Sequence, residues 1–285
     1  MLFCSAPRSA PAAGLAIVVF TSYIMDQELA ETILKTLELI LFVAIWNSWV
    51  LKDYLVKPLL RLLLRFSARL RRTRVEGVFG VPAHLYALTV ILLWGLTVCV
   101  LSLWWVSGRS WSELGLGTGT PLRCGIGFTI AALYIVWWWS LHRRALLEQP
   151  AWVEQLRHRL ATDERVPRTP GERRAMMLVT VPTTGFCEEI LFRGYVMWYL
   201  AIWTGPVAAV ALSSFLFGFA HLDDGVLGSL RATIFGVLFA LTMLTAGSLW
   251  PSILMHSATD VISLEFAYRL RTVAKEETPD RELPA

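Results

Sequence analysis

Three ionisable residues lie inside one long apolar stretch of this sequence. Glu188, Glu189 and Arg193 interrupt the run 175–203, which otherwise carries no charge. Near the centre of a membrane-spanning helix, each charge costs roughly 2.5 kcal/mol or more. Charges kept at that cost are paired with one another or serve a function, so this run is the first candidate for a functional site.

The two adjacent glutamates differ in their spacing from other ionisable residues. Glu189 and Arg193 are four residues apart, so on a helix they share one face, with the acid N-terminal to the base, and they predict a structural ion pair. Glu188 points about 100° away from Glu189 and has no partner nearby in the sequence. We therefore expect its partners to come from other parts of the chain.

Two further apolar stretches supply ionisable side chains. His221 ends one of them, and His256 and Asp260 lie four residues apart in another. Taken singly, each has a structural explanation: a helix cap for His221, and an interhelical hydrogen-bonded pair for His256 and Asp260. Together with the glutamates they place ionisable groups on three separate stretches, which predicts a shared polar site inside a helical bundle.

Composition assigns the chain to the membrane class. Of its 285 residues, 55% are hydrophobic, and 13 are Trp and 14 Phe. Eight, eight and four of the 26 basic residues fall in segments 52–74, 143–174 and 269–281, beside apolar runs. This distribution is typical of cytoplasmic loops and of attraction to anionic membrane lipid, and it argues against a nucleic-acid partner.

The four cysteines indicate neither a disulfide framework nor a zinc site. Cys4, Cys99, Cys124 and Cys187 are scattered and form no CxxC pair. We interpret them as small apolar residues.

The apolar runs predict an all-α, polytopic membrane helix bundle that forms a single domain over 1–285. Seven spans are expected, at about 32–51, 83–106, 124–141, 175–203, 207–221, 226–247 and 250–270. Residues 1–25 form an uncertain N-terminal extension that would add an eighth span if it crosses the membrane. Gly205-Pro206 is expected to interrupt the helix between the fourth and fifth spans.

Segment 52–74 predicts a basic amphipathic helix at the membrane surface. Lys57, Arg61, Arg65 and Arg69 recur every four residues, and leucines fill the opposite side. The alternative is a solvated connector with a chance stripe of charge.

The basic segments set the expected topology. With all three in the cytoplasm, the N-terminus lies outside and the C-terminus inside a bacterial inner membrane. Segment 142–174 is then a charged cytoplasmic loop and 271–285 a polar, disordered tail. These boundaries put Glu188 near mid-membrane but His221 and His256 near opposite surfaces, so the predicted site requires tilted, displaced or differently bounded helices.

The ionisable residues resemble a known pattern. The three motifs, in order, are Glu188-Glu189-xxx-Arg193, Phe217-xxx-His221 and His256-xxx-Asp260. Over about 178–260 they resemble the CPBP family, the CAAX-protease and bacteriocin-processing family that includes the type II CAAX prenyl endopeptidases.

The resemblance implies an intramembrane endopeptidase that hydrolyses a peptide bond of a membrane-associated protein or peptide, including CAAX-type prenylated ones. It implies a glutamate-activated water, no cofactor, and a catalytic core at 175–270. The catalytic residues carried over are Glu188 as general base, His221 to orient the water, and His256 and Asp260 to stabilise the oxyanion. Glu189 and Arg193 would support the site.

One residue departs from the family pattern. Prenyl endopeptidases of the family typically have Asn at the position of Asp260, and an ionised Asp cannot donate a hydrogen bond to an oxyanion. Asp260 is therefore either protonated or accepts a hydrogen bond from His256 and fixes its tautomer, and we favour the second role. The change weakens the case for a prenylated substrate.

Other functions stay open at this point. Glu188, His221, His256 and Asp260 are plausible zinc ligands, although the sequence has no HExxH motif. Some members of the family are associated with bacteriocin immunity or secretion, which suggests a non-catalytic membrane scaffold. A proton-coupled transporter would use the same residues as a relay, but it normally has repeats or broken helices that are not evident here.

Overall fold

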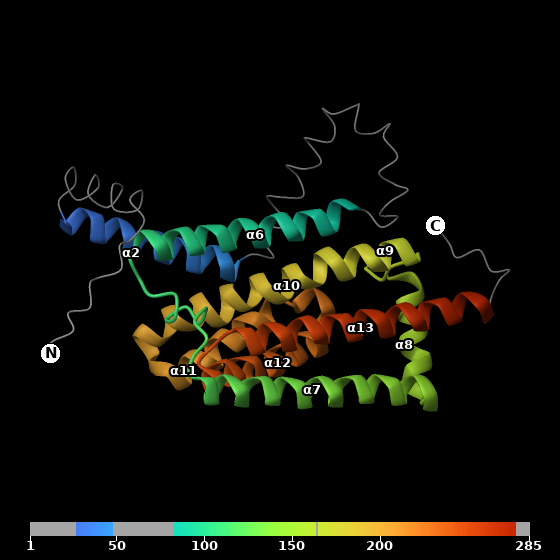
Figure 1. The fold of residues 1–285 in the computed structure, drawn as a ribbon. Helices are drawn as coiled ribbons and strands as arrows, with labels where there is room; N and C mark the ends of the chain where they lie inside the picture. Colours follow the sequence, from blue (N-terminus) through green and yellow to red (C-terminus); the bar gives the residue numbers. More distant parts are fainter. Residues whose placement is uncertain (1–26, 48–82, 164, 278–285) are drawn as a thin grey trace, which may run out of the picture.

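The structure is a bundle of helices (Figure 1). The computed structural model describes residues 27–47, 83–163 and 165–277, and every regular element in these ranges is helical. The elements are α2 (Gln27–Trp46), α6 (Ala83–Val106), α7 (Pro121–Glu148), α8 (Ala151–Thr162), α9 (Pro170–Ala175), η2 (Met176–Thr180), α10 (Val181–Glu188), η3 (Glu189–Val196), α11 (Met197–Phe219), η4 (Leu222–Asp224), α12 (Gly225–Ala246) and α13 (Trp250–Glu277). The predicted all-α class is confirmed.

Four segments of the described chain are long and apolar enough to cross a membrane. They are Thr89–Val106, Pro121–Glu148, Pro170–Phe219 and Leu222–Ala246. The 50-residue segment contains the fourth predicted span and all but the last two residues of the fifth. The first and seventh predicted spans correspond to helices α2 and α13, which are not among these four.

The 50-residue segment folds back on itself at the predicted break. Gly205 has φ +78°, a left-handed conformation that glycine adopts without steric cost, and Pro206 follows it. As a result, Phe192 of η3 and Phe217 of α11 face each other with ring centroids 5.1 Å apart. The fold therefore brings the end of α11, next to His221, alongside the segment that carries the glutamates.

Helix α7 is longer than predicted, and the predicted loop that follows it contains a further helix. Helix α7 begins at Pro121, where the Thr120 side chain caps it, and continues seven residues beyond the predicted end at 141. The predicted loop 142–174 contains the 12-residue helix α8. Hydropathy identified neither the extension of α7 nor the helix α8, because a helix outside the apolar layer is polar and gives no apolar run.

The predicted polar tail is partly helical. Helix α13 continues through Glu277, so residues 271–277 are not disordered as expected. The Arg271 guanidinium donates hydrogen bonds to the carbonyls of Ala161, Asp163 and Val166, which ties this end of α13 to α8 and the following loop. The predictions for 1–25, for the amphipathic segment 52–74 and for 278–285 lie outside the described residues.

Helices α10 and α13 pack very closely, and glycine makes this possible. A Cβ atom at Gly185 of α10 would lie 2.1 Å from the Ser257 hydroxyl oxygen and 3.1 Å from its backbone nitrogen. Figure 1 shows the yellow α10 beside the red α13 along much of their length. The close approach brings polar side chains of the two helices into contact.

Candidate active site

The candidate site lies where α10 and η3 meet α13. Nε2 of His256 is 3.7 Å from Oε2 of Glu188 and 3.8 Å from Oδ2 of Asp260. The His256 and Glu188 side chains are 7% and 14% exposed, whereas Asp260 is 35% exposed. The site is therefore mostly buried and is most accessible at Asp260.

Glu189 makes two contacts at once. Its Oε1 is 3.1 Å from Nη1 of Arg193, which is the predicted ion pair, and both side chains are fully buried. The same oxygen accepts a hydrogen bond of 2.9 Å from Nδ1 of His256. Spacing along one helix predicted the first contact but not the second, because the second joins residues 67 positions apart.

The contact with Glu189 defines what His256 presents to the site. An ionised carboxylate only accepts hydrogen bonds, so Nδ1 of His256 carries a proton and Nε2 faces Glu188 and Asp260. Carboxylate oxygens of Glu188, Glu189 and Asp260 lie within 4 Å of the His256 ring nitrogens, and Nε2 is a hydrogen-bond donor when both ring nitrogens carry a proton.

Arg193 is held by aromatic rings as well as by Glu189. Its guanidinium carbon lies 4.0 Å from the centroid of Phe217 and 5.6 Å from that of Phe239. The Phe239 ring also stacks on His256, with centroids 5.2 Å apart. Cation–π contacts of this kind compensate part of the cost of burying the charge.

Asp260 differs from its expected role as the acceptor for His256. Its short hydrogen bond, 2.8 Å, comes from the Thr184 hydroxyl, and Glu189 is the acceptor for the His256 N–H. Thr184 was not among the predicted site residues. Its position four residues before Glu188, on the same helical face, was a signal that could have identified it.

His221 approaches the site from the end of α11. Its Nδ1 is 2.8 Å from the carbonyl oxygen of Phe217, an acceptor, so Nδ1 is protonated and Nε2 of the neutral ring can accept a hydrogen bond. The Phe217 ring lies 4.6 Å from the His221 ring and 5.9 Å from the His256 ring, centroid to centroid.

The structure thus brings together groups that the predicted boundaries placed at different depths. Glu188, His256 and Asp260 meet directly, Glu189 joins them through His256, and Phe217 links His221 to the same cluster. The fold-back at Gly205 and the close packing of α10 on α13 account for this convergence.

The part of the chain that the structure describes has no group of three His, Cys, Asp or Glu side chains arranged to hold a metal ion. The cysteines at 99, 124 and 187 are free, and Cys4 lies outside the described residues.

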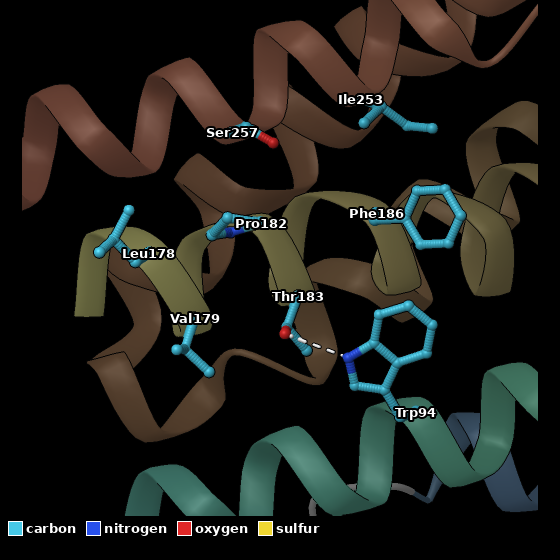
Figure 2. Close-up of a pocket in the computed structure, with 8 residues that line it drawn as sticks. All are labelled: Trp94, Leu178, Val179, Pro182, Thr183, Phe186, Ile253 and Ser257. Carbon is cyan, nitrogen blue, oxygen red and sulfur yellow. Dashed lines mark hydrogen bonds between the residues drawn. The ribbon is translucent and has the colours of Figure 1, made fainter. Parts of the chain in front are cut away.

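A separate open groove of about 510 Å³ lies between α6, η2, α10 and α13 (Figure 2). The residues that line it are Trp94, Leu178, Val179, Pro182, Thr183, Phe186, Ile253 and Ser257. The indole of Trp94 donates a 3.2 Å hydrogen bond to the Thr183 hydroxyl. Pro182 and Phe186 share a face of α10 that points about 200° away from the face of Thr184 and Glu188, so the groove lies on a different side of α10 from Glu188.

Comparison with known proteins gives one result that bears on function. Residues 170–262 match the family described as type II CAAX prenyl endopeptidase Rce1-like. The matched residues contain all three motifs, which confirms the resemblance found in the sequence, and they make up about a third of the chain. Searches of curated proteins and of solved structures found no match.

Proposed function

We propose that this protein is an intramembrane endopeptidase that hydrolyses a peptide bond with a water molecule activated by Glu188. The observation that carries the proposal is the approach of Glu188 on α10 to His256 on α13, within 3.7 Å, in a largely buried site. The match of residues 170–262 to an endopeptidase family supports the same reaction class. We assign the catalytic core to residues 175–270.

In the proposed reaction, Glu188 is the general base. Its carboxylate removes a proton from water as the water oxygen attacks the peptide carbonyl carbon. Nε2 of His221 accepts the second water hydrogen and orients the nucleophile. When the C–N bond breaks, Glu188 returns the proton to the leaving amine, so the products are a carboxylate and an amine after proton release.

His256 stabilises the charge that develops on the carbonyl oxygen. Its Nε2–H donates to the oxyanion in a site with little water, where one such donor is typically worth a factor of about 10²–10³ in rate. Glu189 holds the opposite ring nitrogen and so keeps Nε2 directed at the reacting carbonyl. Arg193 pairs with Glu189 and holds its carboxylate in place.

The substrate we propose is a membrane-associated peptide or protein, and CAAX-type prenylated proteins are the class that the family match supports. We place the basic loops in the cytoplasm of a bacterial cell, with the N-terminus outside and the C-terminus inside. Asp260 in place of Asn sets this chain apart from typical prenyl endopeptidases, so prenylated and unprenylated substrates should be tested side by side.

The direct test is a comparison of cellular peptide termini between wild type and a Glu188→Ala strain. We expect at least one membrane-associated precursor to remain uncleaved in the variant and to be processed again when wild type is supplied. Complete rescue of every deletion phenotype by a Glu188→Ala/His221→Ala double variant would contradict the proposal and favour a scaffold. Loss of cleavage on thorough chelation, restored by added zinc, would favour the metal-dependent version.

A further inference from the structure

The described residues between α8 and α9, which are 163 and 165–169, contact two parts of the candidate site and are called the α8–α9 loop. It leads directly into the continuous helix that starts at Pro170 and carries Glu188. On one side, Arg271 of α13 holds the loop through the carbonyls of Asp163 and Val166, each at 2.8 Å. The loop is therefore fixed to the helix that carries His256 and Asp260.

On its other side the loop reaches the turn that follows His221. The Arg165 guanidinium is oriented by Asp163, through hydrogen bonds of 3.1 Å from Nε and from Nη2. Its Nη1 forms an ion pair and hydrogen bond with Oδ1 of Asp224 in η4. Arg165 thus bridges an aspartate of its own loop and an aspartate of the turn η4.

Asp224 is linked to His221 through the backbone. Its N–H donates a 3.0 Å hydrogen bond to the carbonyl of His221, which closes the short 3₁₀ turn. His221 lies where α11 ends, and helix ends loosen more readily than helix centres unless other groups hold them. An anchor on Asp224 therefore restrains the backbone that carries the His221 ring.

From these contacts we propose that Arg165, acting through Asp224, is a positioning residue that sets the place of His221 relative to Glu188. This rests on the proposed function for the role of His221, but the geometric claim is independent of it. The ion pair joins the two ends of one stretch of chain. This stretch runs from Arg165 along α9 and α10 to Glu188, and then through η3 and α11 to His221 and Asp224. The ion pair therefore limits how far the segment that carries Glu188 and the segment that carries His221 can separate.

The exposure of the Arg165 and Asp224 side chains determines how much kcat should fall when their ion pair is removed. The Arg165 and Asp224 side chains are 54% and 33% exposed, so water and salt screen the pair, and we expect a moderate contribution. For Arg165→Gln, and likewise for Asp224→Asn, we expect kcat to fall about fivefold with little change in KM. The double variant should be no slower than Arg165→Gln alone, because Asp224→Asn removes only a contact that Arg165→Gln has already removed.

The matched control is Arg269→Gln. It removes another arginine at the same end of the molecule, one that pairs with Glu265 on α13 and is 60% exposed. We expect the control to change kcat less than about twofold. Asp224→Glu, which keeps the charge, should retain more activity than Asp224→Asn.

A second measurement does not depend on activity. The ring resonances of selectively labelled histidines, compared between wild type and Arg165→Gln in detergent, should show a shift for His221 and none for His158, which is exposed on α8. If the His221 signal shifts but no protease activity exists, the proposed function fails and the positioning claim stands. An unshifted His221 signal, or an additive loss of kcat in the double variant, would overturn the positioning claim.

Discussion

At the residue scale, Glu189 proves to have two roles rather than one. Its spacing from Arg193 predicted a structural ion pair, and the structure adds the hydrogen bond to Nδ1 of His256. Glu188, by contrast, has its contacts with residues of other helices. The two adjacent glutamates therefore differ in their contacts, because a helix directs them to different neighbours.

The two roles of Glu189 can be separated experimentally. Glu189→Leu should lower folded yield sharply, because a fully buried Arg193 without its partner costs about 3–5 kcal/mol. Adding Arg193→Met should restore the yield, since a buried pair replaced by apolar residues is often well tolerated. We expect the double variant to fold but remain inactive, because His256 has lost the acceptor of its Nδ1–H. Yield is measured by size-exclusion chromatography and activity by peptide cleavage, and full activity in the folded double variant would contradict the second role.

Thr184 offers a second test at this scale, with its neighbour as control. Thr184→Val removes the 2.8 Å hydrogen bond to Asp260, and we expect cleavage to slow about fivefold, the effect of one hydrogen bond of about 1 kcal/mol. Thr183→Val removes the bond from Trp94 in the groove and should leave kcat nearly unchanged if the groove is not the catalytic cavity. Equal effects of both variants on kcat would argue against a specific contribution of Thr184.

At the element scale, the site depends on the close packing of α10 on α13. Gly185→Ala would place a methyl group 2.1 Å from the Ser257 hydroxyl and 3.1 Å from its backbone nitrogen, so the hydroxyl must rotate away and the helices must shift by a few tenths of an ångström. We expect a loss of about 1–3 kcal/mol in stability and a larger loss of activity, because Glu188 and His256 separate. Thermal unfolding and cleavage rates measure the two effects.

The control for Gly185 is another helical glycine. A Cβ atom added at Gly125 of α7 would meet no other atom within 4 Å, so Gly125→Ala should be neutral or should stabilise the helix by up to about 1 kcal/mol. A Gly185→Ala variant that behaved like Gly125→Ala would show that the α10–α13 spacing is not critical.

The α8–α9 loop predicts a dependence of stability on acid pH. Burial raises the pKa of Asp163, but the hydrogen bonds and the charge of Arg165 together outweigh burial and lower it below its ordinary value. A lowered carboxyl pKa adds stability above about pH 4, and this contribution is lost as the pH falls through the lowered pKa. We expect the stability difference between wild type and Asp163→Asn to be present at about pH 6–7 and to shrink on acidification, measured by thermal unfolding. A difference independent of pH would contradict this assignment.

At the scale of the whole molecule, hydropathy predicted the helical class and the approximate positions of the apolar helices, and the pair Gly205-Pro206 predicted the break between two of them. It did not predict α8 or the extensions of α7 and α13, because these are polar and are held by individual contacts such as those of Arg271. The types and spacing of Glu188, His221, His256 and Asp260 predicted a shared site, which stays a prediction. Which nitrogen of His256 contacts which carboxylate depends on the rotation and spacing of α10 and α13, and a sequence pattern does not contain that information.

The central claim is that Glu188 activates the water, and one measurement tests it most directly. Wild type, Glu188→Gln and Glu113→Gln are purified, reconstituted in lipid vesicles, and assayed on a membrane-associated precursor found in the comparison of cellular peptide termini. Gln keeps the size of Glu but cannot take a proton, and Glu113 is an exposed carboxylate in the α6–α7 loop. We predict that Glu188→Gln lowers kcat about a thousandfold, within the range typical of general-base catalysis, while Glu113→Gln retains full activity. A Glu188→Gln variant that cleaves within about twofold of the wild-type rate would contradict the claim.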